Sequence, residues 1–65
     1  MNYLEKLRKD KGLLQVDVAK DLRIAQSTVS KLEANKLDPN MKTLKLYSLR
    51  FKVTTDKIID KLMVS

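Results

Sequence analysis

A short stretch of polar side chains, spaced for one side of a helix, is the part of the sequence best suited to chemistry. If residues 26–34 form a helix, Val29 and Leu32 share one side of it. The opposite side then carries an amide, two hydroxyls and one cation, with no acid and no large apolar residue: Gln26, Ser27, Ser30 and Lys31. Such groups suit a DNA groove, where Gln pairs with adenine and Lys donates to guanine. The alternative is an ordinary solvated helix face.

The composition removes most catalytic alternatives. The chain has 65 residues and contains no Cys and no His. It therefore lacks a disulfide framework, the common zinc ligands, the usual general base and a thiol nucleophile. A carboxylate-only active site is conceivable, but a domain this small rarely forms the concave pocket that it needs. We expect one domain over residues 1–65, with no enzyme activity, metal, cofactor or small-molecule ligand.

The charge balance of the chain is basic. Fourteen Lys and Arg residues oppose eight Asp and Glu residues, for a net charge of +6. This excess favours an anionic partner, nucleic acid first and a membrane surface second. A membrane-surface helix is the weaker reading because the polar faces carry charges of both signs. No apolar run approaches the roughly 20 residues of a membrane span, and the first residues do not resemble a signal peptide, so we expect a cytoplasmic protein.

Apolar residues recur at helical spacing in five segments, so the expected fold is all-α. We expect helices over residues 2–11, 15–22, 26–34, 41–51 and 55–63. Gly12 is the natural residue to follow the first helix, and Pro39 cannot continue the third. Asn40 can cap the fourth helix, and Thr54 or Thr55 the last. The helices are too short to be stable alone, so packing must hold them.

The second and third of these helices are separated by only about three residues, Arg23-Ile24-Ala25. Two short helices with this spacing are typical of a helix-turn-helix, in which the second helix enters the DNA major groove. The stretches that carry the wider pattern are Gln15 to Leu22, Ile24 to Glu33, Pro39, Thr43-Leu44 and Val53 to Ile59. Their order and spacing resemble the Cro/CI-type helix-turn-helix family, the phage-repressor or XRE-like group of regulators, over roughly residues 3–62.

The resemblance implies a lambda-repressor-like fold and a role for particular residues on double-stranded DNA. The residues at base-contacting positions are Gln26, Ser27, Ser30 and Lys31. Gln15 matches the phosphate-binding Gln that opens the first motif helix, as suits a helix N-terminus. Asn35 and Lys36 match the loop that grips the DNA backbone, and Lys42 is a further phosphate candidate.

Three other residues match family positions that hold the recognition helix in place. Arg8 and Glu33 match an ion pair that ties the first helix to the recognition helix. Ala19 matches the small residue where the two motif helices touch, and a larger side chain there should push them apart.

The chain departs from the family pattern around the turn. Arg23 stands where Gly is usual. If the backbone there is left-handed, a residue with a Cβ costs about 1 kcal/mol. A rearranged turn is the alternative. Leu14 and Ala25 stand where Ser or Thr often caps the two motif helices. Asn35 replaces a common Gly, but Asn tolerates the left-handed region.

Family members usually bind palindromic sites as dimers, so the resemblance implies a homodimer. The candidate interface residues are Leu46, Leu49, Ile59 and Met63, with Val64 nearby. Ile59 and Met63 could instead close the core. We expect a sequence-specific transcriptional regulator, most simply a repressor. An autorepressing antitoxin and an interaction module that no longer binds DNA are the alternatives.

Overall fold

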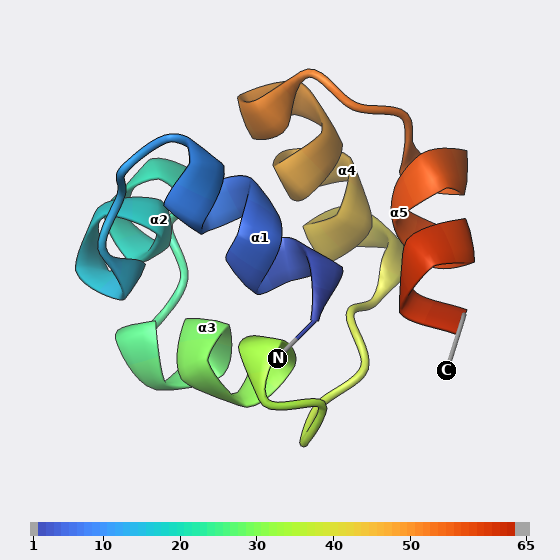
Figure 1. Cartoon of the computed structure of the whole chain (residues 1–65). Helices are drawn as coiled ribbons and strands as arrows, with labels where there is room; N and C mark the ends of the chain where they lie inside the picture. The colour runs from blue at the N-terminus through green and yellow to red at the C-terminus, as the bar shows by residue number, and fades with distance from the viewer. Residues whose placement is uncertain (1, 64–65) are drawn as a thin grey trace.

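The chain folds into five helices and no strand within the part that is described. The computed structural model describes residues 2–63. The helices are α1 (Tyr3–Asp10), α2 (Gln15–Leu22), α3 (Gln26–Glu33), α4 (Met41–Phe51) and α5 (Thr55–Met63). In Figure 1, α1 lies in the middle of the view, with α2 and α3 to one side and α4 and α5 to the other. The all-α prediction is therefore confirmed.

Every helix contributes to one hydrophobic core. The buried apolar residues are Leu4, Val18, Ala19, Leu22, Val29, Leu32, Leu44, Tyr47, Phe51 and Ile58. α2 packs against α3 and α4, whereas α1 packs against α3 and α5. Helix α3 is thus supported on two sides, by α1 and by α2.

The helix ends follow the chemistry expected of their residues. Asn40 Oδ1 accepts a hydrogen bond from the Thr43 amide at 2.8 Å, and Thr54 Oγ1 accepts one from the Lys57 amide at 3.0 Å. Gly12 follows α1 with φ of +68°. The expected helix 2–11 is one residue shorter at each end because Asn2 and Lys11 are its caps. Ala34 likewise caps α3 rather than extending it.

The turn between α2 and α3 keeps the left-handed backbone that a Gly would favour. Arg23 has φ of 57° and ψ of 44°. Neither motif helix has a side-chain cap, as Leu14 and Ala25 lead one to expect. Asp17 compensates in part, because its Oδ2 accepts from the Leu14 amide at 2.8 Å. The turn therefore retains its geometry despite its unusual residues.

A salt bridge that the sequence did not predict joins α2 to α4. Arg50 Nε lies 2.6 Å from Asp21 Oδ2, and the Arg50 guanidinium also lies 5.3 Å from the centre of the Phe51 ring. The pair is partly exposed, so its contribution to stability is small. Within residues 2–63, none of the helices combines the length and the apolar character of a membrane span.

Candidate nucleic-acid interface

The exposed face of α3 carries the four side chains expected to contact bases. Val29 and Leu32 are buried, at 0% and 2% exposure. The residues on the solvent side are all exposed: Gln26, Ser27, Ser30 and Lys31. None of these four side chains takes part in a hydrogen bond with another described residue. Their donors and acceptors are therefore available to an external partner.

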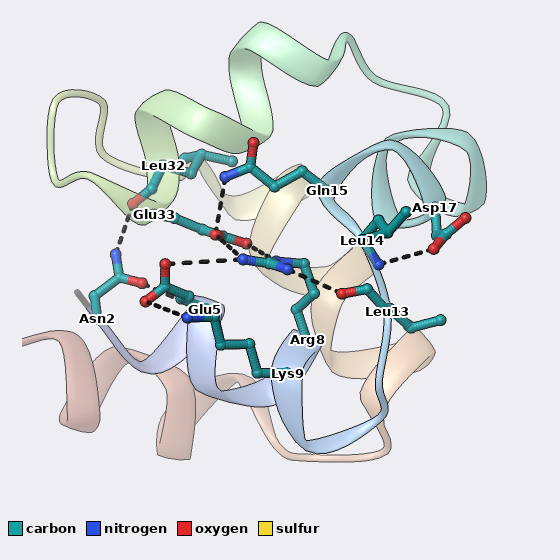
Figure 2. Close-up of polar contacts among 10 residues, drawn as sticks. All are labelled: Asn2, Glu5, Arg8, Lys9, Leu13, Leu14, Gln15, Asp17, Leu32 and Glu33. Carbon is teal, nitrogen blue, oxygen red and sulfur yellow. Dashed lines mark hydrogen bonds and ion pairs between the residues drawn. The ribbon is translucent and has the colours of Figure 1, made fainter.

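Arg8 and Glu33 form the expected pair, and it is buried. Arg8 Nε donates to Glu33 Oε2 at 2.8 Å, and the second guanidinium nitrogen, Nη2, donates to Oε1 at 2.9 Å. The remaining nitrogen, Nη1, donates to the Leu13 carbonyl at 2.9 Å (Figure 2). The hydrogen bonds to Glu33 raise the pKa of Arg8 above its usual value. The C-terminal end of α3 is thereby fastened to α1 and to the loop that follows α1.

Gln15 joins the same network, which the sequence did not predict. Its Nε2 donates to Glu33 Oε1 at 3.1 Å, so Glu33 accepts from both α1 and α2 (Figure 2). The side chain is half-buried at the first position of α2. The Gln15 amide group has a second N–H and an oxygen besides the atom that Glu33 holds. No spacing rule links residues 15 and 33, because the contact exists only once α2 and α3 have packed.

Asn2 makes a second unexpected bridge, from the start of α1 to the end of α3. Its Oδ1 accepts from the Glu5 amide at 3.2 Å and so caps α1. Its Nδ2 donates to the Leu32 carbonyl at 2.6 Å and to Asn35 Oδ1 at 3.0 Å. Figure 2 shows the Asn2 amide nitrogen directed at the Leu32 carbonyl. The sequence offered only the N-cap preference of Asn as a signal.

The four candidates for phosphate contacts lie on different elements. Asn35 follows α3 in the left-handed region, with φ of 60°, and is exposed. Lys36 is exposed directly after it, and its amide donates to the Lys31 carbonyl at 2.9 Å. Lys42 is exposed in the first turn of α4. Three of the phosphate candidates, including Gln15, therefore adjoin the C-terminal end of α3 or its anchor, whereas Lys42 belongs to another helix.

Ala19, the expected small residue of the motif, is buried in α2. It is 6% exposed, and its carbonyl accepts from the Ile24 amide at 3.0 Å across the turn. Its helix, α2, packs against α3. The position therefore has little room for a larger side chain.

The four candidates for a dimer interface differ in exposure. Leu49 and Met63 are 73% and 79% exposed. Leu46 and Ile59 are only half-buried and pack against the core. Ile59 and Met63 also line an open cavity of about 310 Å³ between α5 and the α3–α4 loop. Val64 lies outside the described residues.

Tyr47 brings a buried hydroxyl close to the anchor of α3. The residue is fully buried, and its hydroxyl has no hydrogen-bond partner among the described residues. Burial raises the pKa of Tyr47 to about 12, and the negative charge of Glu33 adds to the effect. Tyr47 is therefore neutral at physiological pH.

Two short helices joined by a left-handed turn, the second with a polar outer face, define a helix-turn-helix fold. A family model described as helix-turn-helix matches residues 4–58, and the chain belongs to this family, of XRE type. The HTH-type transcriptional activator BcrR of Enterococcus faecalis is 39% identical over 56 residues. The match covers 86% of this chain but 28% of BcrR, so the chain spans about a quarter of that relative's length. No solved structure matches the chain. The family and the relative point to a DNA-binding regulator of transcription rather than an enzyme.

Proposed function

We propose that this chain is a sequence-specific double-stranded DNA-binding domain of the Cro/CI type that regulates transcription from an operator. The observation that carries the proposal is the exposed face of α3. Its side chains are free of internal hydrogen bonds, while the helix behind them is fixed by the Arg8–Glu33 pair. A rigid helix with uncommitted donors and acceptors suits direct reading of base edges. The whole of residues 1–65 would act as one unit, in the cytoplasm where the chromosome lies.

Within this function, Gln26, Ser27, Ser30 and Lys31 would contact bases. Gln15, Asn35, Lys36 and Lys42 would contact phosphates, which position the domain without reading sequence. The net charge of +6 would add a salt-dependent attraction to any duplex. Arg8, Glu33 and Ala19 would fix the angle of the recognition helix.

A dimer on a palindromic operator is the assembly that we propose. One recognition helix reads only a few base pairs, so two copies about one DNA turn apart give useful specificity. Leu49 and Met63, both strongly exposed, are the first candidates for the contact, with Leu46 and Ile59 behind them. Sedimentation of wild-type protein and of Leu49→Lys and Met63→Lys variants tests this assignment. A monomer–dimer equilibrium that neither substitution disturbs would place the interface elsewhere.

Repression by occupying the operator is the simplest mode, because it needs no contact beyond DNA binding. The relative is named as an activator, which favours activation as the second candidate. A reporter gene with the operator placed over or upstream of its promoter separates these modes. An autorepressing antitoxin would show the same binding and would differ in its neighbouring gene. An interaction module without DNA binding is the remaining alternative.

The deciding experiment is selection from random duplex DNA with the purified chain at physiological salt. Enrichment of a two-fold-symmetric motif is the expected result and supplies the operator. Enrichment of a single half-site would retain sequence-specific binding but contradict the dimer. If nothing is enriched and residual binding is lost as salt rises, the interaction-module alternative takes precedence.

A further inference from the structure

Asn2 serves two helices with one side chain. Its Oδ1 caps α1, while its Nδ2 reaches the Leu32 carbonyl at 2.6 Å and Asn35 Oδ1 at 3.0 Å. The acceptor and the donor of one amide are thus committed to two different helices. A residue needed only as a cap would not require the donor.

The contacts of Nδ2 fall on the segment that would meet the DNA backbone. The Leu32 carbonyl is near the end of α3, and its other interaction is a long hydrogen bond of 3.4 Å from the Asn35 amide. Asn35 itself is held in a left-handed conformation with φ of 60°. Asn2 therefore braces the point at which the chain leaves the recognition helix.

The bond to Asn35 also decides which way that side-chain amide faces. Because Oδ1 of Asn35 accepts from Asn2, its Nδ2 is the atom left without a partner among the described residues. A phosphate oxygen only accepts hydrogen bonds, so it can bind Asn35 through Nδ2 but not through Oδ1. A reversed amide would present oxygen to oxygen.

We propose that Asn2 is a positioning residue that orients Asn35 as a hydrogen-bond donor to a DNA phosphate. The inference rests on the proposed DNA-binding function and adds to it a residue outside the helix-turn-helix. Asn2 acts through Asn35 and does not itself touch DNA. The effect is on phosphate binding and so is the same for every duplex sequence.

The test replaces Asn2 with Ser, which keeps an oxygen to cap α1 but is too short to reach Asn35. Asn40→Ser is the matched control, since it makes the same change at the cap of α4. Affinity is measured for the selected operator and for a scrambled duplex, well below the melting temperature of each variant. Asn2→Ser should weaken binding to both duplexes about three- to tenfold, whereas Asn40→Ser should not.

The decisive readout is a double-mutant cycle with Asn35→Ala, because a general loss of structure would not reproduce it. If Asn2 acts through Asn35, then Asn2→Ser causes no further loss of affinity once Asn35 is Ala. Additive losses, or an Asn35→Ala variant that binds like wild type, would overturn the role of Asn2 while leaving the proposed function intact. A wild-type chain that binds no duplex at all would overturn both.

A second measurement needs no variant and covers the case in which Asn2→Ser fails to fold. In the wild-type protein, the side-chain amide protons of Asn35 should shift in NMR spectra when the duplex is added. Those of Asn40 serve as the reference. Asn35 protons that stay unchanged on a bound duplex would overturn the proposal.

Discussion

The planar guanidinium of Arg8 and the carboxylate of Glu33 are joined by two parallel hydrogen bonds of 2.8 and 2.9 Å in a site that is almost closed to water. This geometry gives strong and directional pairing. Its two partners are 8% and 3% exposed, so removing either one leaves a buried charge that has lost its main partner. Arg8 would keep only the Glu5 carboxylate at 3.8 Å, and Glu33 only the hydrogen bond from Gln15. The pair therefore matters more for what its loss would expose than for the energy of the contact itself.

Glu33→Ala should lower the free energy of unfolding by about 3 kcal/mol, because Arg8 would stay buried with only the more distant Glu5 carboxylate, 3.8 Å from its Nη2, as a charged partner. The paired replacement Arg8→Met with Glu33→Leu should cost less, since neither of the two buried charges remains and Glu5 keeps Lys9 as a partner at 3.9 Å. Urea unfolding followed by circular dichroism measures both. A single substitution that is no more harmful than the pair would show that desolvation is not the main cost.

Tyr47→Phe should leave stability at pH 7 unchanged or raise it by about 1 kcal/mol, because it removes a buried hydroxyl that has no partner. The dependence of stability on pH above pH 10 should also change. The folded pKa of Tyr47, about 12, lies above the ordinary value of 10.0, so the folded state holds this proton more tightly. The stability that the folded state gains by holding this proton is complete below pH 10 and is lost as the pH rises through about 12, because the unfolded chain releases the proton first. The gap in stability between Tyr47→Phe and wild type should therefore widen in favour of the variant above pH 10, as measured by urea unfolding at each pH.

Gly12→Ala should cost about 1 kcal/mol from backbone strain alone. Gly12 has φ of +68°, yet a Cβ at this position would meet no atom within 4 Å. Gly12→Asn should cost less, because Asn accepts the left-handed region more readily. Thermal melts of the two variants check this order. An Ala variant as stable as wild type would mean that the backbone relaxes out of the left-handed region.

Lys31→Ala and Lys36→Ala should distinguish contacts to bases from contacts to phosphates. Loss of Lys31 should reduce discrimination against a changed operator base by about 1–3 kcal/mol while weakening scrambled duplexes less. Loss of Lys36 should weaken all duplexes equally and reduce the slope of log affinity against log salt by about 0.9. Fluorescence anisotropy titrations over a range of salt provide both quantities. Equal loss on every sequence would remove Lys31 from base reading.

Helical periodicity and the capping preferences of single residues were sufficient to predict most of the fold. Helical periodicity placed all five helices within one residue at either end, and the roles of Gly12, Asn40 and Thr54 followed from their own backbone chemistry. At Arg23 the family resemblance left two alternatives, a left-handed or a rearranged turn, and the structure has the left-handed one. Sequence patterns predict these features because each depends on residues within four positions of one another.

The contacts that sequence reasoning missed join residues far apart in the chain. Gln15 meets Glu33 across 18 positions, and Asn2 meets Leu32 across 30. Such pairs depend on the angle between packed helices, which periodicity does not specify. Leu46 illustrates the same limit, since it is a sequence-based candidate for the dimer interface, yet packing leaves it half-buried against the core.

The recognition helix is tied at its C-terminal end and uncapped at Ala25, where it begins. Amide hydrogen exchange should therefore be graded along α3. Amides toward Leu32 and Glu33 should exchange only when the whole molecule unfolds, whereas those near Gln26 and Ser27 should exchange through local fraying. The last turn of α3 is then held by the rest of the molecule, whereas the first turn, which would meet the bases, can open locally without unfolding the domain.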